Sequence, residues 1–206
     1  MGVKSLAMQE RVVNEYLVGQ GEADGVKIVV AWDPHPENPR DWYDCRASLV
    51  CWDPRHGELG DRHAFAQPRD FITFAEQLGV KGIAYRPLYL LDHSGLWLST
   101  TAFQAAPDST QVGWAYMTRE KYDEYFEDDG KDWREIALRI VEAEVAEYGS
   151  YLCGYVFDVE VSEGPSSGEP DCYTVFGQPG EDLRDAIKDE LYESAYAAID
   201  AIEWPN

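Results

Sequence analysis

Residues 85–117 constrain the fold more than any other part of the chain. An apolar run, residues 88–91, ends at Asp-His-Ser-Gly, which is typical of a turn because Gly95 tolerates positive φ. Residues 96–98 open a second apolar run, and residues 112–116 alternate between apolar and small or polar side chains with the period of a strand. The stretch therefore predicts three short neighbouring strands with polar side chains at their ends.

The rest of the sequence predicts helices and strands without regular βαβ alternation. The apolar spacing predicts helices at residues 5–18, 69–78, 118–126, 133–148 and 181–202, and further strands at residues 26–32, 47–52, 152–161 and 172–176. We expect Gly79 and Gly149 to end the helices that precede them. This order indicates an α+β fold with a largely antiparallel sheet of about seven strands and helices packed mainly on one face.

The length of 206 residues, 45% of them hydrophobic, suits a single domain with its own core. Within this domain, 1–206, we distinguish an N-terminal helix and linker (1–25), a sheet-rich part (26–120) and an acidic helix-strand-strand-helix part (121–206). We expect strands 26–32 and 47–52 to pair in a long hairpin and to share one sheet with the strands of residues 85–117. Two sheets without shared pairing would contradict this single-domain interpretation.

Several motifs resemble a known group of sequences. They are PLYLLDHSG, STTAF and DSTQVGWAYM, together with PRDWYDCRASLVCWDPRHGELGDRH before them and DCYTVFG after them. These segments are similar to a family of small uncharacterised proteins encoded by bacteriophages and other mobile elements, and the resemblance spans roughly residues 26–177. The family has no established activity, so the resemblance implies a phage context and no mechanism.

The charge is unevenly distributed along the chain. There are 39 acidic and 17 basic residues, a net charge of −22, and residues 121–206 alone hold a net charge of −17. Such a field repels nucleic acids and anionic membranes and favours basic partners. Adaptation to high salt would produce a similar composition, and we keep this alternative.

The sequence predicts a location in the cytoplasm of the host cell. No apolar run is long enough for a membrane span, and the first residues lack the apolar core of a signal peptide. The four cysteines show no C-x-x-C spacing, so we expect free thiols that act as small buried side chains.

Two turns contain the candidate catalytic or metal-binding residues. A Gly-Asp-x-His turn carries Asp61 and His63, and the Asp-His-Ser-Gly turn carries Asp92 and His93. Carboxylates and imidazoles of this kind can ligate a metal or relay protons if the turns converge. The alternative is that each is a local hydrogen-bonded pair. Further polar residues could line a pocket with His93, or could instead make local turn and capping bonds: Ser94, Thr100, Thr101, Asp108 and Gln111.

The second candidate site is an acidic surface in the last third of the chain. Four carboxylates follow one another at helical spacing in the predicted final helix, and others precede and follow them. The predicted partner-binding residues are Glu127, Asp128, Asp129, Asp132, Asp182, Asp185, Asp189, Glu193 and Asp200. A charged helix face is also the ordinary outcome of solvation, so this stripe alone does not establish mimicry of a nucleic acid.

Three functional hypotheses follow. The first is an acidic accessory protein that binds and inhibits a basic, nucleic-acid-handling host protein, as in antirestriction or other counter-defence, with mimicry of a nucleic acid as one way to do so. This hypothesis requires no cofactor and no direct contact with nucleic acid or membrane, and it leaves the oligomeric state open. The alternatives are a metal-dependent or acid–base enzyme that uses Asp61, His63, Asp92 and His93, or a small-molecule binder that uses the same four residues with Trp97 or Trp114.

Overall fold

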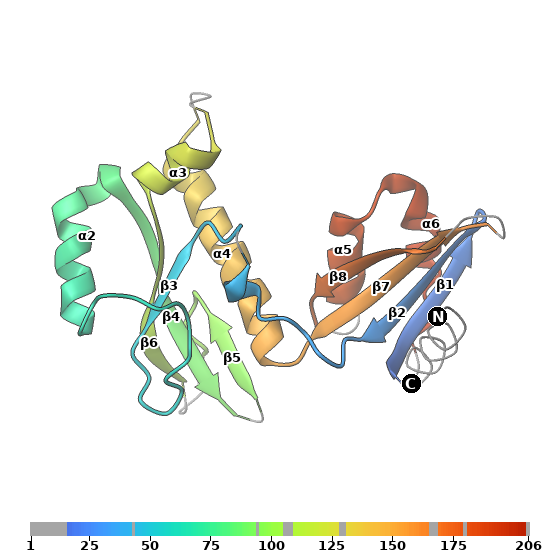
Figure 1. Ribbon diagram of the computed structural model, residues 1–206, viewed down its shortest axis with the longest axis horizontal. Coiled ribbons are helices and arrows are strands. Elements are labelled where there is room, and N and C mark those ends of the chain that lie inside the picture. Colours follow the sequence, from blue (N-terminus) through green and yellow to red (C-terminus); the bar gives the residue numbers. More distant parts are fainter. Residues whose placement is uncertain are drawn as a thin grey trace, which may run out of the picture. The chain divides into compact units, whose positions relative to one another are not determined.

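The fold is α+β, with eight strands in two antiparallel sheets among the residues that the structure describes (Figure 1). The structure is a computed structural model, and it describes residues 16–42, 44–93, 95–104, 109–127, 131–164, 169–178 and 181–204. The chain divides into two compact units, one formed by residues 1–36 and 154–206 and the other by residues 37–153. Each unit contains one of the two sheets.

The first unit combines segments from both ends of the sequence. Its sheet has the strand order β1-β2-β7-β8, and the strands are β1 (Leu17–Ala23), β2 (Val26–Trp32), β7 (Val156–Glu163) and β8 (Asp171–Phe176). One face packs against α5 (Glu181–Glu190), η2 (Glu193–Ala195) and α6 (Tyr196–Asp200). The core between them includes Ile28, Val30, Phe157, Val159, Ile187 and Ile199.

Strand β1 was not predicted. Residues 17 and 18 belong to this strand and not to the predicted helix 5–18, whose remaining residues lie outside the described ones except for Tyr16. A Cβ atom on Gly21 would come 2.3 Å from the carbonyl oxygen of Ala198, and one on Gly19 would come 2.8 Å from Ile202. The two glycines therefore let the C-terminal segment approach the strand closely.

The second unit is a sheet covered on both faces. Its strand order is β3-β6-β4-β5, with β3 (Ser48–Cys51), β4 (Ile83–Asp92), β5 (Leu96–Ser99) and β6 (Ser109–Thr118). Alternate side chains of the strands divide between two cores. One face packs against α3 (Arg119–Tyr125) and α4 (Trp133–Leu152), and the other against α2 (Pro68–Gly82), while η1 (Pro39–Asp41) contacts α4.

The prediction of one sheet with a hairpin between residues 26–32 and 47–52 is wrong. Strand β2 pairs with β1 and β7, whereas β3 pairs with β6. The hydrophobic pattern predicts that a segment is a strand, but it does not specify the partner. The prediction that helices cover mainly one face holds for the first sheet and is wrong for the second, because α2 packs on the face opposite α4.

The predicted helix 181–202 is broken in two. A straight helix of 22 residues would be about 33 Å long, whereas strands of six to eight residues span roughly 20–26 Å. The break at Leu191 and Tyr192 lets the segment turn back over the sheet. The six apolar residues whose helical spacing predicted this helix are all buried: Leu183, Ile187, Leu191, Ala195, Ile199 and Ile202.

The two glycines predicted to end helices behave differently. Gly79 has the non-helical angles φ 64° and ψ −178°, which interrupt α2 before its last turn. Gly149 does not end α4, which continues to Leu152. A Cβ atom at this position would come 3.0 Å from the carbonyl oxygen of Leu98, so Gly149 serves the close contact between α4 and β5.

Two further predictions concern the cysteines and membrane insertion. All four cysteines are free, but none is fully buried as predicted: Cys172 is exposed and the other three are partly buried. In the described part of the chain, no helix combines the length and the apolar character needed to cross a bilayer.

Candidate functional site

The best-defined polar site lies where β3 ends. After Cys51 the chain leaves the sheet at Trp52, whose N–H still donates to the carbonyl oxygen of Val112 at 2.8 Å. Beyond this point β3 no longer pairs with β6, and a hollow of about 420 Å³ opens beside β6. We call it the Arg55 hollow; its lining residues are Trp52, Asp53, Pro54, Arg55, Asp92, Thr110, Gln111 and Val112.

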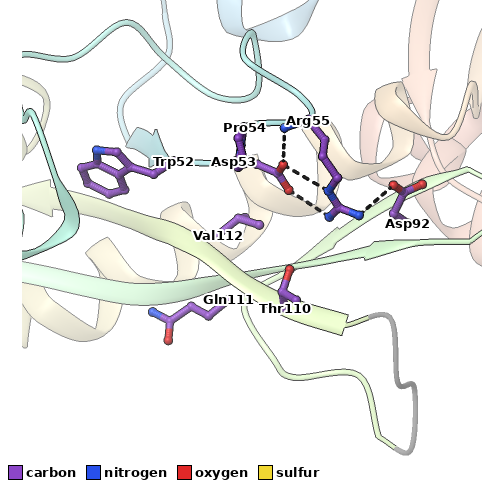
Figure 2. A pocket seen from close by; sticks show the side chains of 8 residues that line it. All are labelled: Trp52, Asp53, Pro54, Arg55, Asp92, Thr110, Gln111 and Val112. Carbon is purple, nitrogen blue, oxygen red and sulfur yellow. Dashed lines mark hydrogen bonds and ion pairs between the residues drawn. The ribbon is translucent and has the colours of Figure 1, made fainter.

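An arginine between two carboxylates forms one wall of the Arg55 hollow (Figure 2). Asp53 accepts hydrogen bonds from the backbone N–H of Arg55 at 2.8 Å and from its Nη2 at 3.1 Å. Nη1 of Arg55 lies 3.3 Å from Oδ2 of Asp92, and Nε2 of His56 lies 3.3 Å from the same oxygen. Figure 2 shows Thr110 pointing toward this group, whereas Gln111 and Trp52 point away from it.

The charged side chains of this wall differ in their exposure to solvent. The Asp53 side chain is 3% exposed, while that of Arg55 is 53% exposed. The hydrogen bonds and charge of Arg55 lower the pKa of the Asp53 carboxyl below its usual value, against the opposing effect of burial. Two carboxylates face one guanidinium, so the wall keeps a net negative charge when the imidazole is neutral, and it suits a ligand with cationic or hydrogen-bond-donating groups.

Local backbone features shape the Arg55 hollow. The register between β4 and β6 shifts at Leu88 and Tyr89, where Val112 is the extra residue on β6. Gly113 follows, and it lies so close to β3 that a Cβ atom would come 1.9 Å from the carbonyl oxygen of Val50. Thr110 and Asp92 lie on the same side of the sheet as Arg55 (Figure 2).

Asp61 and Asp92 bind different partners in the structure. Its two carboxylate oxygens each lie 2.9 Å from the guanidinium of Arg40, and Oδ2 also accepts from the backbone N–H of Leu49 at 2.8 Å. Arg40 also donates to Glu144 at 2.7 Å and to the carbonyl oxygen of Ala47 at 2.8 Å. Asp61 thus belongs to a nearly buried structural network that links η1, β3 and α4.

The two histidines also lie in different surroundings. Nε2 of His63 is 3.1 Å from the carbonyl oxygen of Cys51, and its ring lies 4.7 Å from that of Trp52. His93 is exposed, and its backbone N–H donates to the carbonyl oxygen of Gly95. Within the described residues, no group of three or more His, Cys, Asp or Glu side chains is arranged to hold a metal ion.

Only some of the other predicted pocket residues lie at the Arg55 hollow. Gln111 and Asp92 both line the Arg55 hollow. Ser94 and Asp108 lie outside the described residues. Sequence reasoning missed Asp53, Arg55 and His56, although Asp-Pro-Arg at the end of a strand is a recognisable Asx-turn signal.

The acidic surface is exposed wherever the structure describes it. On α5 the predicted residues Asp182, Asp185 and Asp189 are exposed, as is Glu190, and the exposed Glu193 follows on η2. Asp200 is exposed and pairs with Lys188, and Asp132 caps α4 by accepting from the backbone N–H of Arg134. Glu127 is also exposed, whereas Asp128 and Asp129 lie outside the described residues.

Comparison with protein-family models, with curated proteins and with solved structures gives no match.

The Asp53 carboxylate should contribute to stability in a pH-dependent way. Replacing Asp53 with asparagine is expected to lower the free energy of unfolding by about 1.5–3 kcal/mol at pH 7, because charge-assisted bonds to Arg55 are lost. The folded-state pKa lies below the ordinary value of 3.8, so this contribution is present above that value and is lost as the pH falls through the folded-state pKa.

Urea unfolding of wild type and Asp53→Asn at several pH values between 7 and 3 would measure this difference. The gap between the two proteins should be constant above pH 5 and narrow below about pH 4. A gap that does not depend on pH would show that the charge of Asp53 contributes nothing.

Proposed function

We propose that this protein is an acidic accessory protein that binds and inhibits a basic, nucleic-acid-handling protein of a host cell, in the manner of phage counter-defence proteins. The interaction takes place in the cytoplasm and needs no cofactor. The observation that carries the proposal is the outward face of α5. It presents the exposed carboxylates of Asp182, Asp185 and Asp189, while Leu183 and Ile187 on its other face are buried in the core.

The cations of α5 do not neutralise this face within the fold. Arg184 donates from Nη2 to the carbonyl oxygen of Ile202 at 3.1 Å, and its guanidinium lies over the ring of Trp204. Lys188 forms an ion pair with Asp200. Both basic side chains of the helix are therefore directed to other parts of the same unit, and the three carboxylates remain available to a basic partner.

The alternative of an enzyme has less structural support. It requires Asp61, His63, Asp92 and His93 to act at one site. Asp61 is bound by Arg40, Asp92 is bound by Arg55 and His56, and His63 lies against Trp52. A small-molecule binder retains the Arg55 hollow as a possible location, since Asp92 and Gln111 both line it.

Charge reversal on α5 and η2 tests the proposal. The triple variant Asp185→Lys, Asp189→Lys and Glu193→Lys should abolish capture of the basic partner from a bacterial lysate. Capture by the wild type should weaken steeply between roughly 50 and 200 mM salt, since exposed charges are screened over about 10 Å at 0.1 M. The melting temperature should stay nearly unchanged or rise, because Asp185 and Asp189 repel each other four residues apart on α5.

A matched control changes the net charge by the same amount elsewhere. The variant Glu37→Lys, Glu76→Lys and Glu120→Lys reverses three exposed carboxylates of the other unit and should capture the partner as the wild type does. The captured protein, identified by mass spectrometry, should lose its nucleic-acid binding or cleavage when the wild-type protein is added. Equal capture by both triple variants, or capture indifferent to salt, would contradict the proposal.

A further inference from the structure

We infer that the open edge of β8 pairs with an extended, basic segment of the protein partner, which joins the sheet of the first unit as a fifth strand. This inference rests on the proposed function, because it assumes a basic partner, and it names the part of the surface and the backbone conformation that the partner uses. The edge, its neighbours in β7 and the segment that follows α5 provide the three observations that support it.

The two edges of this sheet differ. At the β1 edge, Gln20 forms a bridge with Glu203, whose N–H donates to the carbonyl oxygen of Gln20 at 2.9 Å. At the other edge, β8 pairs with β7 alone, and no described strand pairs with its outer side. Among the described residues, no strand covers the outer side of Cys172 and Thr174, so an added strand can pair with their main chain.

Strand β8 also lacks the usual protection of an edge. Its sequence is DCYTVF, without lysine or proline, and its register with β7 runs without a bulge from Asp171 to Phe176. Natural sheets commonly carry a lysine, a proline or a bulge at an open edge, because a regular edge can pair with strands of other chains. Six regular residues are enough for an added segment to pair in the manner of other sheet-edge binding sites.

The face of the sheet away from the helices places carboxylates beside this edge. In β7, Glu160 and Asp158 lie opposite Cys172 and Thr174 of β8. Both β8 side chains are small, so a lysine or arginine of an added strand can reach across them toward the acids. The pKa of the Asp158 carboxyl is raised, first by burial and then by the charges of Asp33 and Glu160, and a cation placed here would relieve that repulsion.

The helix side of the edge carries a second acidic group with an aromatic ring. Tyr192 follows the end of α5 and is 37% exposed. Burial raises the pKa of its hydroxyl, and the charges of Glu163 and Asp171 raise it further. Asp171 lies opposite Val161, two residues before Glu163 in β7. A cation at this end of β8 would meet carboxylates and an aromatic ring together.

The chemistry of the edge selects a basic occupant. Strands β7 and β8 together contain the acids Asp158, Glu160, Glu163 and Asp171 and no lysine or arginine. A second copy of this chain would bring the same acids together across the new pairing and be repelled. A basic segment instead gains opposite charges on both faces of the edge, and its main chain gains the strand pairing.

A defined peptide tests the inference on the full-length protein. The probe is a fluorescein-labelled hexapeptide of alternating lysine and valine, and its binding is followed by fluorescence anisotropy at 50 mM salt. The control peptide has the same sequence with N-methyl groups on all six backbone nitrogens, which keeps the charge and removes the backbone donors on both edges of the peptide. The control should bind about tenfold more weakly or worse, because two or more backbone hydrogen bonds are lost.

Variants of the protein locate the site. Asp158→Asn with Glu160→Gln should weaken binding of the parent peptide several-fold. Glu22→Gln with Asp24→Asn makes the same charge change at the β1 end of the sheet and should leave binding unchanged. Equal binding of the two peptides would overturn the inference and indicate attraction by charge alone. Dimers that form with concentration in light scattering, and that the peptide does not dissociate, would overturn it in favour of a second copy.

The outcomes separate the inference from the proposed function. If the α5 and η2 triple variant loses the partner but the two peptides bind equally, the acidic surface acts without strand pairing, and only the inference fails. If the peptides differ as expected but the triple variant still captures its partner as the matched control does, the edge is a binding site and the proposal based on α5 fails.

Discussion

Replacing Arg40 with alanine is expected to lower the free energy of unfolding by about 3–5 kcal/mol, because it leaves two carboxylates without their cation. The Arg40 side chain is 4% exposed and bridges Asp61 and Glu144, which lie far apart in the sequence. It also donates to the carbonyl oxygen of Ala47. Without the guanidinium, the carboxylates of Asp61 and Glu144 would remain in a poorly solvated region and repel each other.

Urea denaturation of the full-length protein, followed by tryptophan fluorescence, measures this effect. Five of the seven tryptophans lie in residues 37–153, so the signal reports mainly on the unit that contains Arg40. The control is Arg139→Ala, which removes an exposed ion pair with Glu135 on α4 and should change stability by no more than about 0.5 kcal/mol. A loss below about 1 kcal/mol for Arg40→Ala would show that the network does not stabilise the fold.

Replacing Gly113 with alanine is expected to cost about 3 kcal/mol or more. The added Cβ atom would come 1.9 Å from the carbonyl oxygen of Val50 and 2.9 Å from its carbonyl carbon. These atoms belong to the backbone of β3, which cannot rotate away as a side chain could, so the two strands must separate. The Arg55 hollow should change shape as well, because its loop continues directly from β3.

Two measurements check the Gly113→Ala variant. Urea denaturation gives the loss of stability, and hydrogen exchange should show faster exchange of the β3 amides that pair with β6. Gly57→Ala is the matched control, since a Cβ atom at Gly57 would meet nothing within 4 Å. It should change stability by no more than about 0.5 kcal/mol. Equal behaviour of the two variants would mean that β3 and β6 can relax around the methyl group.

Local patterns in the sequence predicted local structure well. Apolar alternation located β6, and the spacing of apolar residues located the start of α4 at Trp133 and six of the seven buried apolar residues after residue 180. These signals depend on residues close together in the chain, which is why they are visible without the fold. The α+β class, which follows from the order of the elements, is confirmed.

Features that depend on distant residues were missed. Strand β1 contains Gly19 and Gly21, which weaken a strand pattern, and their purpose becomes visible only when the C-terminal segment lies against them. The pairing of β2 with β7 joins segments more than 120 residues apart. Even so, the Asp24-Gly25 turn, where both residues have positive φ, was a hairpin signal that the sequence contained.

The sequence predicted only those residues of the candidate site that lie at the ends of recognisable strands. Asp92 and Gln111 lie at the ends of strands that the pattern located, and both line the Arg55 hollow. Arg55 and His56 reach Asp92 from a loop 36 or more residues away. The bond between Arg40 and Glu144 spans 104 residues. No spacing rule connects such positions, so they require the three-dimensional structure.

The division of the chain into units has a consequence for its synthesis. Residues 37–153 are inserted between β2 and β7, and the ends of the insertion are held together by the Asp33 N–H, which donates to the carbonyl oxygen of Val156 at 3.0 Å. On the ribosome, all strands of the inserted unit emerge before β7 does. Strand β2 therefore cannot pair with β7 until more than 120 further residues have been translated. The α5 face and the β8 edge consequently form only after the inserted unit has been translated, so a shorter nascent chain exposes neither.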